Sequence, residues 1–186
     1  MKRIAAVLVF ACVLVGNAIA ETRWDLATNY PASAFHTKNI MQFASDAEKA
    51  TGGSLKIVVH PGGAMIKHAE IKRAVSDGRA AAGEVLISLL ADEASVYGID
   101  SIPFLATSYD DARRLYDAQK PFLEKELAKQ GLVLLFSVPW PPQGIYAKRE
   151  ITSVDDLSGL KFRTYNVMTR RIAELAGAPA PQRRWS

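Results

Sequence analysis

The sequence predicts an α/β protein with a largely parallel sheet. Short apolar, β-branched runs alternate with helical repeats of ten or more residues, an order that is typical of parallel strands joined by crossover helices. The run at 84–90 is apolar on both faces, as expected for a strand in the middle of such a sheet. The sequence contains no internal repeat and no low-complexity linker that would separate independent domains.

The first elements follow from their start and stop signals. A strand is expected at 24–29, ending before Tyr30-Pro31. Ser33 is expected to cap a helix whose apolar residues, among them Phe35, recur at helical spacing until Gly52-Gly53. A β-branched strand at 55–59 and a second helix ending at Gly78 follow it.

The middle of the chain continues the alternation. After the third strand, Ser108 is expected to cap a long helix that runs to Gly131 with a disturbance at Pro121. A buried strand is expected at 132–138. Three prolines at 139–142 then break the pattern, because proline cannot continue a central strand.

The last elements are expected to be an extended segment at 145–148, a strand ending at Arg163 and a helix at 167–176. Asn166 stands immediately before that helix, where a side-chain oxygen can accept hydrogen bonds from the first free N–H groups.

The N-terminus has the pattern of a cleavable secretory signal. Lys2 and Arg3 precede an apolar run at 4–16, and Ala18-Ile19-Ala20 provides a small-x-small cleavage site. Residues 1–20 are therefore predicted to be a signal peptide, which places the protein in the periplasm. The only cysteine, Cys12, lies within this segment, so the chain from Glu21 on has no thiol.

The charge does not indicate a nucleic-acid partner. Removing Lys2 and Arg3 from the 23 basic residues leaves 21 against 19 acidic residues, a net charge of +2. Along the helices the basic residues alternate with acidic ones, as in Glu124-Lys125-Glu126, which is typical of a solvated surface.

The most informative segment is Asp155-Asp156-Leu157-Ser158-Gly159-Leu160-Lys161-Phe162-Arg163. An acidic turn and a glycine precede an arginine whose planar fork can bind a carboxylate through two hydrogen bonds. The segment resembles the solute-binding proteins of tripartite ATP-independent periplasmic (TRAP) transporters. Other stretches resemble the same family in the same order: Thr51-Gly52-Gly53-x-Leu55, Pro61-Gly62-Gly63, Ile102-Pro103-Phe104-Leu105 and Ser108-Tyr109-Asp110-Asp111-Ala112.

The resemblance implies a two-lobed, type II periplasmic-binding-protein-like fold with a ligand cleft between the lobes. Residues 21–138 would form the first lobe and 139–177 the start of the second, which in the family continues much further. The stretch 178–186 is an atypical tail rich in proline and arginine. These features suggest a truncated or frameshifted reading of a longer receptor, and a non-functional remnant is the alternative interpretation.

The resemblance also implies the function. Such receptors capture a carboxylate-containing organic acid and deliver it to a permease driven by an ion gradient, without a cofactor. Arg163 matches the arginine that holds the ligand carboxylate. A receptor for an ATP-driven importer is a less favoured alternative. The identity of the acid stays open, although Gln143 in place of a second cation weakly favours a monocarboxylate.

Five further residues are candidate ligand contacts, each with a structural alternative. Trp140 could form an apolar wall or pack among the prolines, and Gln143 could contact the ligand or hold a turn. Tyr30 follows the first strand and would face the cleft, whereas Phe35 is expected in the helix core. Glu84 could bind a ligand hydroxyl or a protein donor. Asn166 could cap its helix and add dipole support for an anion.

The sequence supports neither a metal site nor an active site. His60 and His68 flank a glycine turn with a spacing that matches no compact metal motif, so they are expected to be structural surface residues, and His36 stands alone on the first helix. There is no cysteine nucleophile beyond the signal and no Gly-x-Ser-x-Gly elbow, so an enzyme is unsupported.

Overall fold

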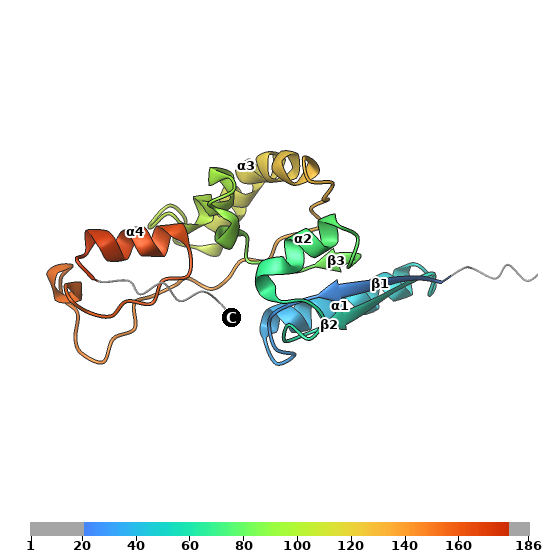
Figure 1. Cartoon of the computed structure of the whole chain (residues 1–186), viewed down its shortest axis with the longest axis horizontal. Coiled ribbons are helices and arrows are strands. Elements are labelled where there is room, and N and C mark those ends of the chain that lie inside the picture. Colours follow the sequence, from blue (N-terminus) through green and yellow to red (C-terminus); the bar gives the residue numbers. More distant parts are fainter. Residues whose placement is uncertain (1–20, 179–186) are drawn as a thin grey trace, which may run out of the picture.

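The computed structural model describes residues 21–178. The predicted signal peptide and the end of the predicted tail, 179–186, lie outside these residues. The molecule is elongated (Figure 1). A small sheet with helix α1 (Phe35–Ala50) occupies one end, helix α4 (Val167–Leu175) occupies the other, and helix α3 (Tyr109–Ala128) lies between them.

The sheet is parallel, as predicted, with the strand order β2-β1-β3. Strand β1 (Thr22–Ala27) pairs along its whole length with β2 (Leu55–His60). Strand β3 (Ala82–Gly83) adds a two-residue pairing on the other side of β1. The first strand is therefore the central one, and the prediction that the third strand is central was wrong.

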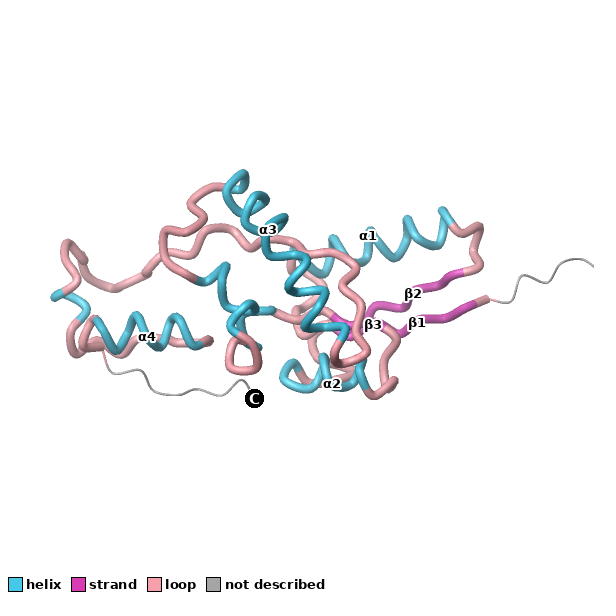
Figure 2. Tube along the Cα trace, turned by 90° about the horizontal axis from the view of Figure 1, so that it is seen from above, coloured by secondary structure: helices cyan, strands magenta, loops and turns pink. Residues whose placement is uncertain are grey.

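The two faces of the sheet are covered by different helices. Leu26 and Ile57 pack with Ile40 and Ala44 of α1, which runs beside the sheet in Figure 2. On the opposite side, the next residue, Ala27, packs against helix α2 (Ile71–Ser76) and its neighbours. Successive side chains of a strand point to opposite faces, so adjacent residues of β1 serve two separate clusters.

Gly83 permits helix α2 to approach the sheet closely. A Cβ atom on Gly83 would collide with the side chain of Ile71 and would lie 3.1 Å from Cγ2 of Val75. A larger residue would push α2 away from β3. The glycine therefore helps to position the chain that follows it, beginning with Glu84.

The region after β3 differs from the prediction. Residues 84–90 do not continue as a strand; instead Ile87–Leu90 form a 3₁₀ helix, η2, and Ser95–Ser101 form another, η3. Ile87 packs beside the fully buried Tyr97 in the cluster that covers α3. The apolar residues of this segment are thus partly buried, and they pack in a helical cluster and not in a sheet.

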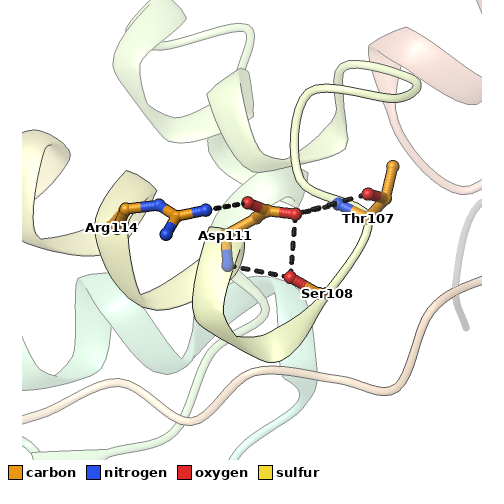
Figure 3. A network of polar contacts seen from close by, with 4 residues as sticks. All are labelled: Thr107, Ser108, Asp111 and Arg114. Carbon is orange, nitrogen blue, oxygen red and sulfur yellow. Dashed lines mark hydrogen bonds and ion pairs between the residues drawn. The ribbon is translucent and has the colours of Figure 1, made fainter.

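Helix α3 begins at its predicted cap. The Ser108 hydroxyl accepts the N–H of Asp111 at 3.1 Å and donates to the Asp111 carboxylate at 2.8 Å (Figure 3). The same carboxylate receives bonds from Thr107 and pairs with Arg114. Hydrogen bonds from Ser108 and Arg114 lower the Asp111 pKa to about 2. The helix continues through Pro121 without a break and ends at Ala128.

Three other expectations about local structure were wrong. Ser33 does not cap α1, whose cap is Ala34 with no side-chain hydrogen bond. Neither 132–138 nor 160–163 is a strand. In the first of these segments Leu132 and Leu134 pack toward α3, whereas Val133 is 82% exposed. The alternating pattern of a strand is present there, but no hydrogen-bonded partner strand accompanies it among residues 21–178.

Candidate functional site

The candidate site begins where β1 and β3 end. Thr28, which follows β1, is fully buried, and its hydroxyl accepts the N–H of Tyr30 at 3.2 Å and donates to the carboxylate of Glu84. Glu84 follows β3, and its N–H donates to the carbonyl of Ala27 at 2.9 Å. The carboxyl ends of parallel strands meet at one edge of a sheet, so two residues distant in sequence are held together here.

Burial raises the pKa values of both Glu84 and Tyr30. Loss of solvent raises the pKa of Glu84, and the hydrogen bond from Thr28 opposes part of that rise. The Tyr30 pKa is raised to about 12, chiefly by burial and further by the negative charge of Glu84 and by Tyr165. Tyr30 therefore stays a neutral hydrogen-bond donor at physiological pH.

An aromatic cluster surrounds Tyr30. The ring of Trp140 meets Tyr30 edge to face with centroids 5.3 Å apart, and it contacts Phe35 at the same distance. His36 lies against Phe35 at 4.0 Å and against Trp140 at 4.2 Å, and His68 meets Tyr30 at 5.8 Å. We call these five residues the aromatic cluster. It brings together the first strand, the first helix and the proline-rich segment.

One expectation about this cluster was wrong. Phe35 is not in the core of the first helix, because it is 46% exposed and contacts Trp140. His36, which stands alone on the first helix in the sequence, is buried and only 3% exposed. Burial lowers the pKa of His36. Its helical position beside an aromatic residue was the one sequence signal that could have indicated this packing.

Arg163 lies beside Tyr165. Its guanidinium carbon is 5.8 Å from the centre of the Tyr165 ring, and the charge of Arg163 opposes the rise that burial and Asp100 cause in the Tyr165 pKa. Because Tyr165 also acts on the Tyr30 pKa, the two tyrosines are electrostatic neighbours. Tyr165 is thus an electrostatic neighbour of both Arg163 and Tyr30, which the sequence did not indicate.

The acidic turn before Arg163 stabilises the local backbone. Asp156 accepts the N–H groups of Thr152 and Ser153, each at 2.9 Å, and both hydroxyls as well. These bonds lower the Asp156 pKa to about 2. The N–H of Gly159 donates to the carbonyl of Gly177 at 3.0 Å, which connects the turn to the end of α4.

Asn166 is the N-cap of α4, as predicted. Its side-chain oxygen accepts the N–H of Thr169 at 2.8 Å, and the Thr169 hydroxyl completes a capping box. Its amide group donates to the Ser101 hydroxyl at 3.1 Å, which ties α4 to η3. Both ends of the Asn166 side chain are engaged by protein.

Gln143 is held within its own turn. Its side-chain amide donates to the carbonyl of Pro141 at 3.2 Å, and the residue is exposed. The structure therefore brings Tyr30, Trp140 and Glu84 together, places Arg163 beside Tyr165, and gives Gln143 a local contact.

Within 21–178, no three histidine, cysteine or acidic residues are grouped so that they could hold a metal ion. His60 instead pairs with Asp25 at 2.8 Å. None of the helices in this part of the chain is long and apolar enough to cross a membrane.

Comparison with known proteins identifies the family. Residues 26–182 match the sequence profile of DctP, the bacterial extracellular solute-binding protein family 7. A solute-binding protein of Albidiferax ferrireducens is 24% identical over 148 residues, which are 77% of this chain and 43% of that protein.

Solved structures give closer matches. An extracytoplasmic solute receptor of Bordetella pertussis that binds pyroglutamic acid is 52% identical with a TM-score of 0.83, over 86% of this chain and 53% of that one. A marine metagenome TRAP solute-binding protein with co-purified pyroglutamate is 44% identical with a TM-score of 0.83, over 88% and 54%.

A more distant structure shares the fold alone. The sugar acid-binding protein of Advenella mimigardefordensis, in complex with galactonate, is 19% identical with a TM-score of 0.72, over 87% of this chain and 53% of that one. The chain thus spans about half the length of the solved structures that it matches. The matching proteins are solute-binding receptors and not enzymes. The chain belongs to the bacterial extracellular solute-binding protein family 7, and its fold matches about half of that of the solved TRAP solute receptors.

Proposed function

We propose that this protein is a periplasmic receptor that captures a small organic acid and delivers it to a TRAP-type permease driven by an ion gradient. Residues 1–20 would direct its export as a cleavable signal. The permease step follows from the family alone. The receptor step rests on one observation above all. Tyr30 contacts the ring of Trp140, and the negative charge of Glu84 acts on the Tyr30 pKa, so all three residues lie near one another. The ring and the carboxylate would face the same ligand.

The proposed ligand class is a cyclic monocarboxylate of the pyroglutamate type. Two relatives that are 52% and 44% identical bind pyroglutamate. Such a ligand has a carboxylate, a ring with apolar faces, an N–H donor and a carbonyl acceptor. Arg163 would bind the carboxylate through its planar fork, and Trp140 and Tyr30 would contact the ring faces. Glu84 would accept a hydrogen bond from the ligand N–H, because an ionised carboxylate only accepts hydrogen bonds.

Gln143 and Asn166 would contribute less directly to ligand binding, because both side chains already form hydrogen bonds within the protein. Gln143 can reach a ligand only after releasing its bond to Pro141, so we give it a secondary role. Asn166 would act through the N-terminus of α4 and not through its side chain, which is already bonded.

Lobe closure would complete the binding step. We divide the chain into a first lobe at 21–138 and the start of a second at 139–177, with the proline-rich segment 139–142 between them. The ligand would stabilise the closed arrangement by its stronger contacts in that state. Trp140 belongs to the crossing segment, so its ring would move with closure.

The test is a binding screen on the protein secreted to the periplasm of an expression host. Pyroglutamate, galactonate and succinate would be compared by thermal shift and calorimetry. Pyroglutamate should give the largest rise in melting temperature, since a ligand at a hundred times its Kd adds about 2.7 kcal/mol of stability. Preference for galactonate or succinate would contradict the ligand class. A cooperative melt that no acid shifts would contradict the receptor function and favour the alternative of a non-functional remnant.

A further inference from the structure

We propose that His36 is a specificity-determining residue whose Nε2–H donates a hydrogen bond to the ring carbonyl of the bound acid. This inference rests on the proposed function, because it assigns the one polar group of a pyroglutamate-type ligand that Arg163 and Glu84 leave unpaired. No pattern in the sequence indicated that His36 lies at the candidate site.

The first support is the state of the Nε2 atom. His36 is 3% exposed, and Nε2 is buried without a hydrogen-bond partner among the described residues. Leaving a buried polar nitrogen unpaired is unfavourable, so most proteins satisfy such groups. A ligand that supplies the missing acceptor removes this cost only when it is bound.

The second support is the set of aromatic residues that His36 contacts. Its ring lies between Phe35 at 4.0 Å and Trp140 at 4.2 Å, and Tyr30 is 6.1 Å away. Tyr30 in turn connects the cluster to Glu84. His36 therefore borders the same surfaces that would contact the ligand ring, and it adds a polar atom beside the apolar ring faces of Phe35 and Trp140.

The third support is chemical complementarity. The ligand carboxylate needs a cation, the ring N–H needs an acceptor, and the ring carbonyl needs a donor. Burial favours the neutral imidazole, in which one ring nitrogen donates and the other accepts. Neutral His36 can thus serve the carbonyl without attracting a second anion into the site.

Access to Nε2 is coupled to the crossing segment. The Trp140 ring lies against His36. Trp140 is 37% exposed and Phe35 is 46% exposed, so part of the aromatic cluster reaches solvent. Movement of the segment at 139–142 would lift Trp140 from His36 and uncover Nε2. The ligand would then reach Nε2 in the open state and be enclosed on closure.

Two variants and two ligands test the proposal. His36→Phe fills the same space without a donor, and His36→Gln restores a donor. The ligands are pyroglutamate and cyclopentanecarboxylate, which has the ring and carboxylate but neither N–H nor carbonyl. Affinities would be measured by calorimetry, with displacement titration for the weaker acid, and each variant's melt without ligand would be recorded.

H36F should bind pyroglutamate about three- to tenfold more weakly than the wild type, the range for one neutral hydrogen bond. Its affinity for cyclopentanecarboxylate should not change, and H36Q should recover part of the loss. Unchanged pyroglutamate binding in H36F, or an equal loss for both acids, would overturn the inference while the wild-type affinity still supports the proposed function. Failure of the wild type to bind pyroglutamate would overturn the proposed ligand class and this inference together.

Discussion

The rings of Tyr30 and Trp140 meet edge to face with their centroids 5.3 Å apart. Tyr30 comes directly after the first strand, and Trp140 belongs to the proline-rich segment after the longest helix. A contact between these two parts of the chain forms only when the sheet and the crossing segment have both folded. It therefore connects the fold to the proposed binding wall.

Replacing Trp140 by alanine should weaken binding of the cyclic acid. The loss of the ring removes an aromatic contact worth about 0.5–1.5 kcal/mol beyond its buried area, so we expect at least a three- to tenfold increase in Kd. Calorimetry with pyroglutamate measures it. Tyr146→Ala is the matched control, because Tyr146 is 94% exposed. Equal affinities for the wild type and Trp140→Ala would show that Trp140 only packs among the prolines.

Glu84 predicts a pH dependence of stability. Its carboxyl pKa is raised by burial above the ordinary value of 4.5, so the folded protein holds this proton more tightly than the unfolded chain does. The stability that protonation provides is complete below pH 4.5 and is lost as the pH rises through the raised pKa. As the pH rises through this raised pKa, the free energy of unfolding of the wild type should therefore fall relative to that of Glu84→Gln.

Thermal melts of both proteins between about pH 4 and 8 measure the difference. Glu124→Gln, on the exposed face of α3, is the matched control. A constant difference between wild type and Glu84→Gln across this range would contradict the assigned environment of Glu84.

The cap of α3 predicts a loss of stability without a loss of ligand contacts. Ser108→Ala removes the hydroxyl that accepts the Asp111 N–H, and loss of such a cap costs about 1 kcal/mol of unfolding free energy. Urea denaturation measures it. Ser137→Ala, at an exposed serine, should change the unfolding free energy by a few tenths of that value at most. If the two variants unfold at the same urea concentration, the cap contributes nothing.

Local signals in the sequence were sufficient for two helix caps and for the first two strands. The caps at Ser108 and Asn166 were predicted correctly, because a cap depends on a side chain and on backbone groups two or three residues away. The parallel pairing of β1 with β2 follows from the alternation of strands and helices.

The strand predictions were wrong where a strand depends on a partner that is distant in sequence. The apolar segments at 84–90 and 132–138 have the composition of strands, but only Ala82–Gly83 pairs with β1, and the second segment has no partner among the described residues. A short apolar run cannot by itself distinguish a strand from a chain packed against a helix. The same limit applies to His36, whose burial depends on Trp140, far away in sequence.

The sequence suggested part of the candidate site. Tyr30 was proposed because the carboxyl ends of parallel strands are common binding positions, Glu84 as the first residue of an expected strand, and Arg163 through the family resemblance. Their roles in binding stay predictions. Tyr165 and His36 were missed, because their contacts with the site arise from packing between segments that the sequence does not connect.

The most direct test of the central claim is the binding of pyroglutamate by the wild type and by Arg163→Ala, measured by calorimetry on the secreted protein. Loss of a charged hydrogen bond costs about 1.5–3 kcal/mol, so we expect a ten- to hundredfold weaker Kd in Arg163→Ala. Arg171→Ala, which removes an exposed pairing with Glu174, should bind like the wild type. Equal affinities for the wild type and Arg163→Ala would contradict the account, because the carboxylate would then be held elsewhere.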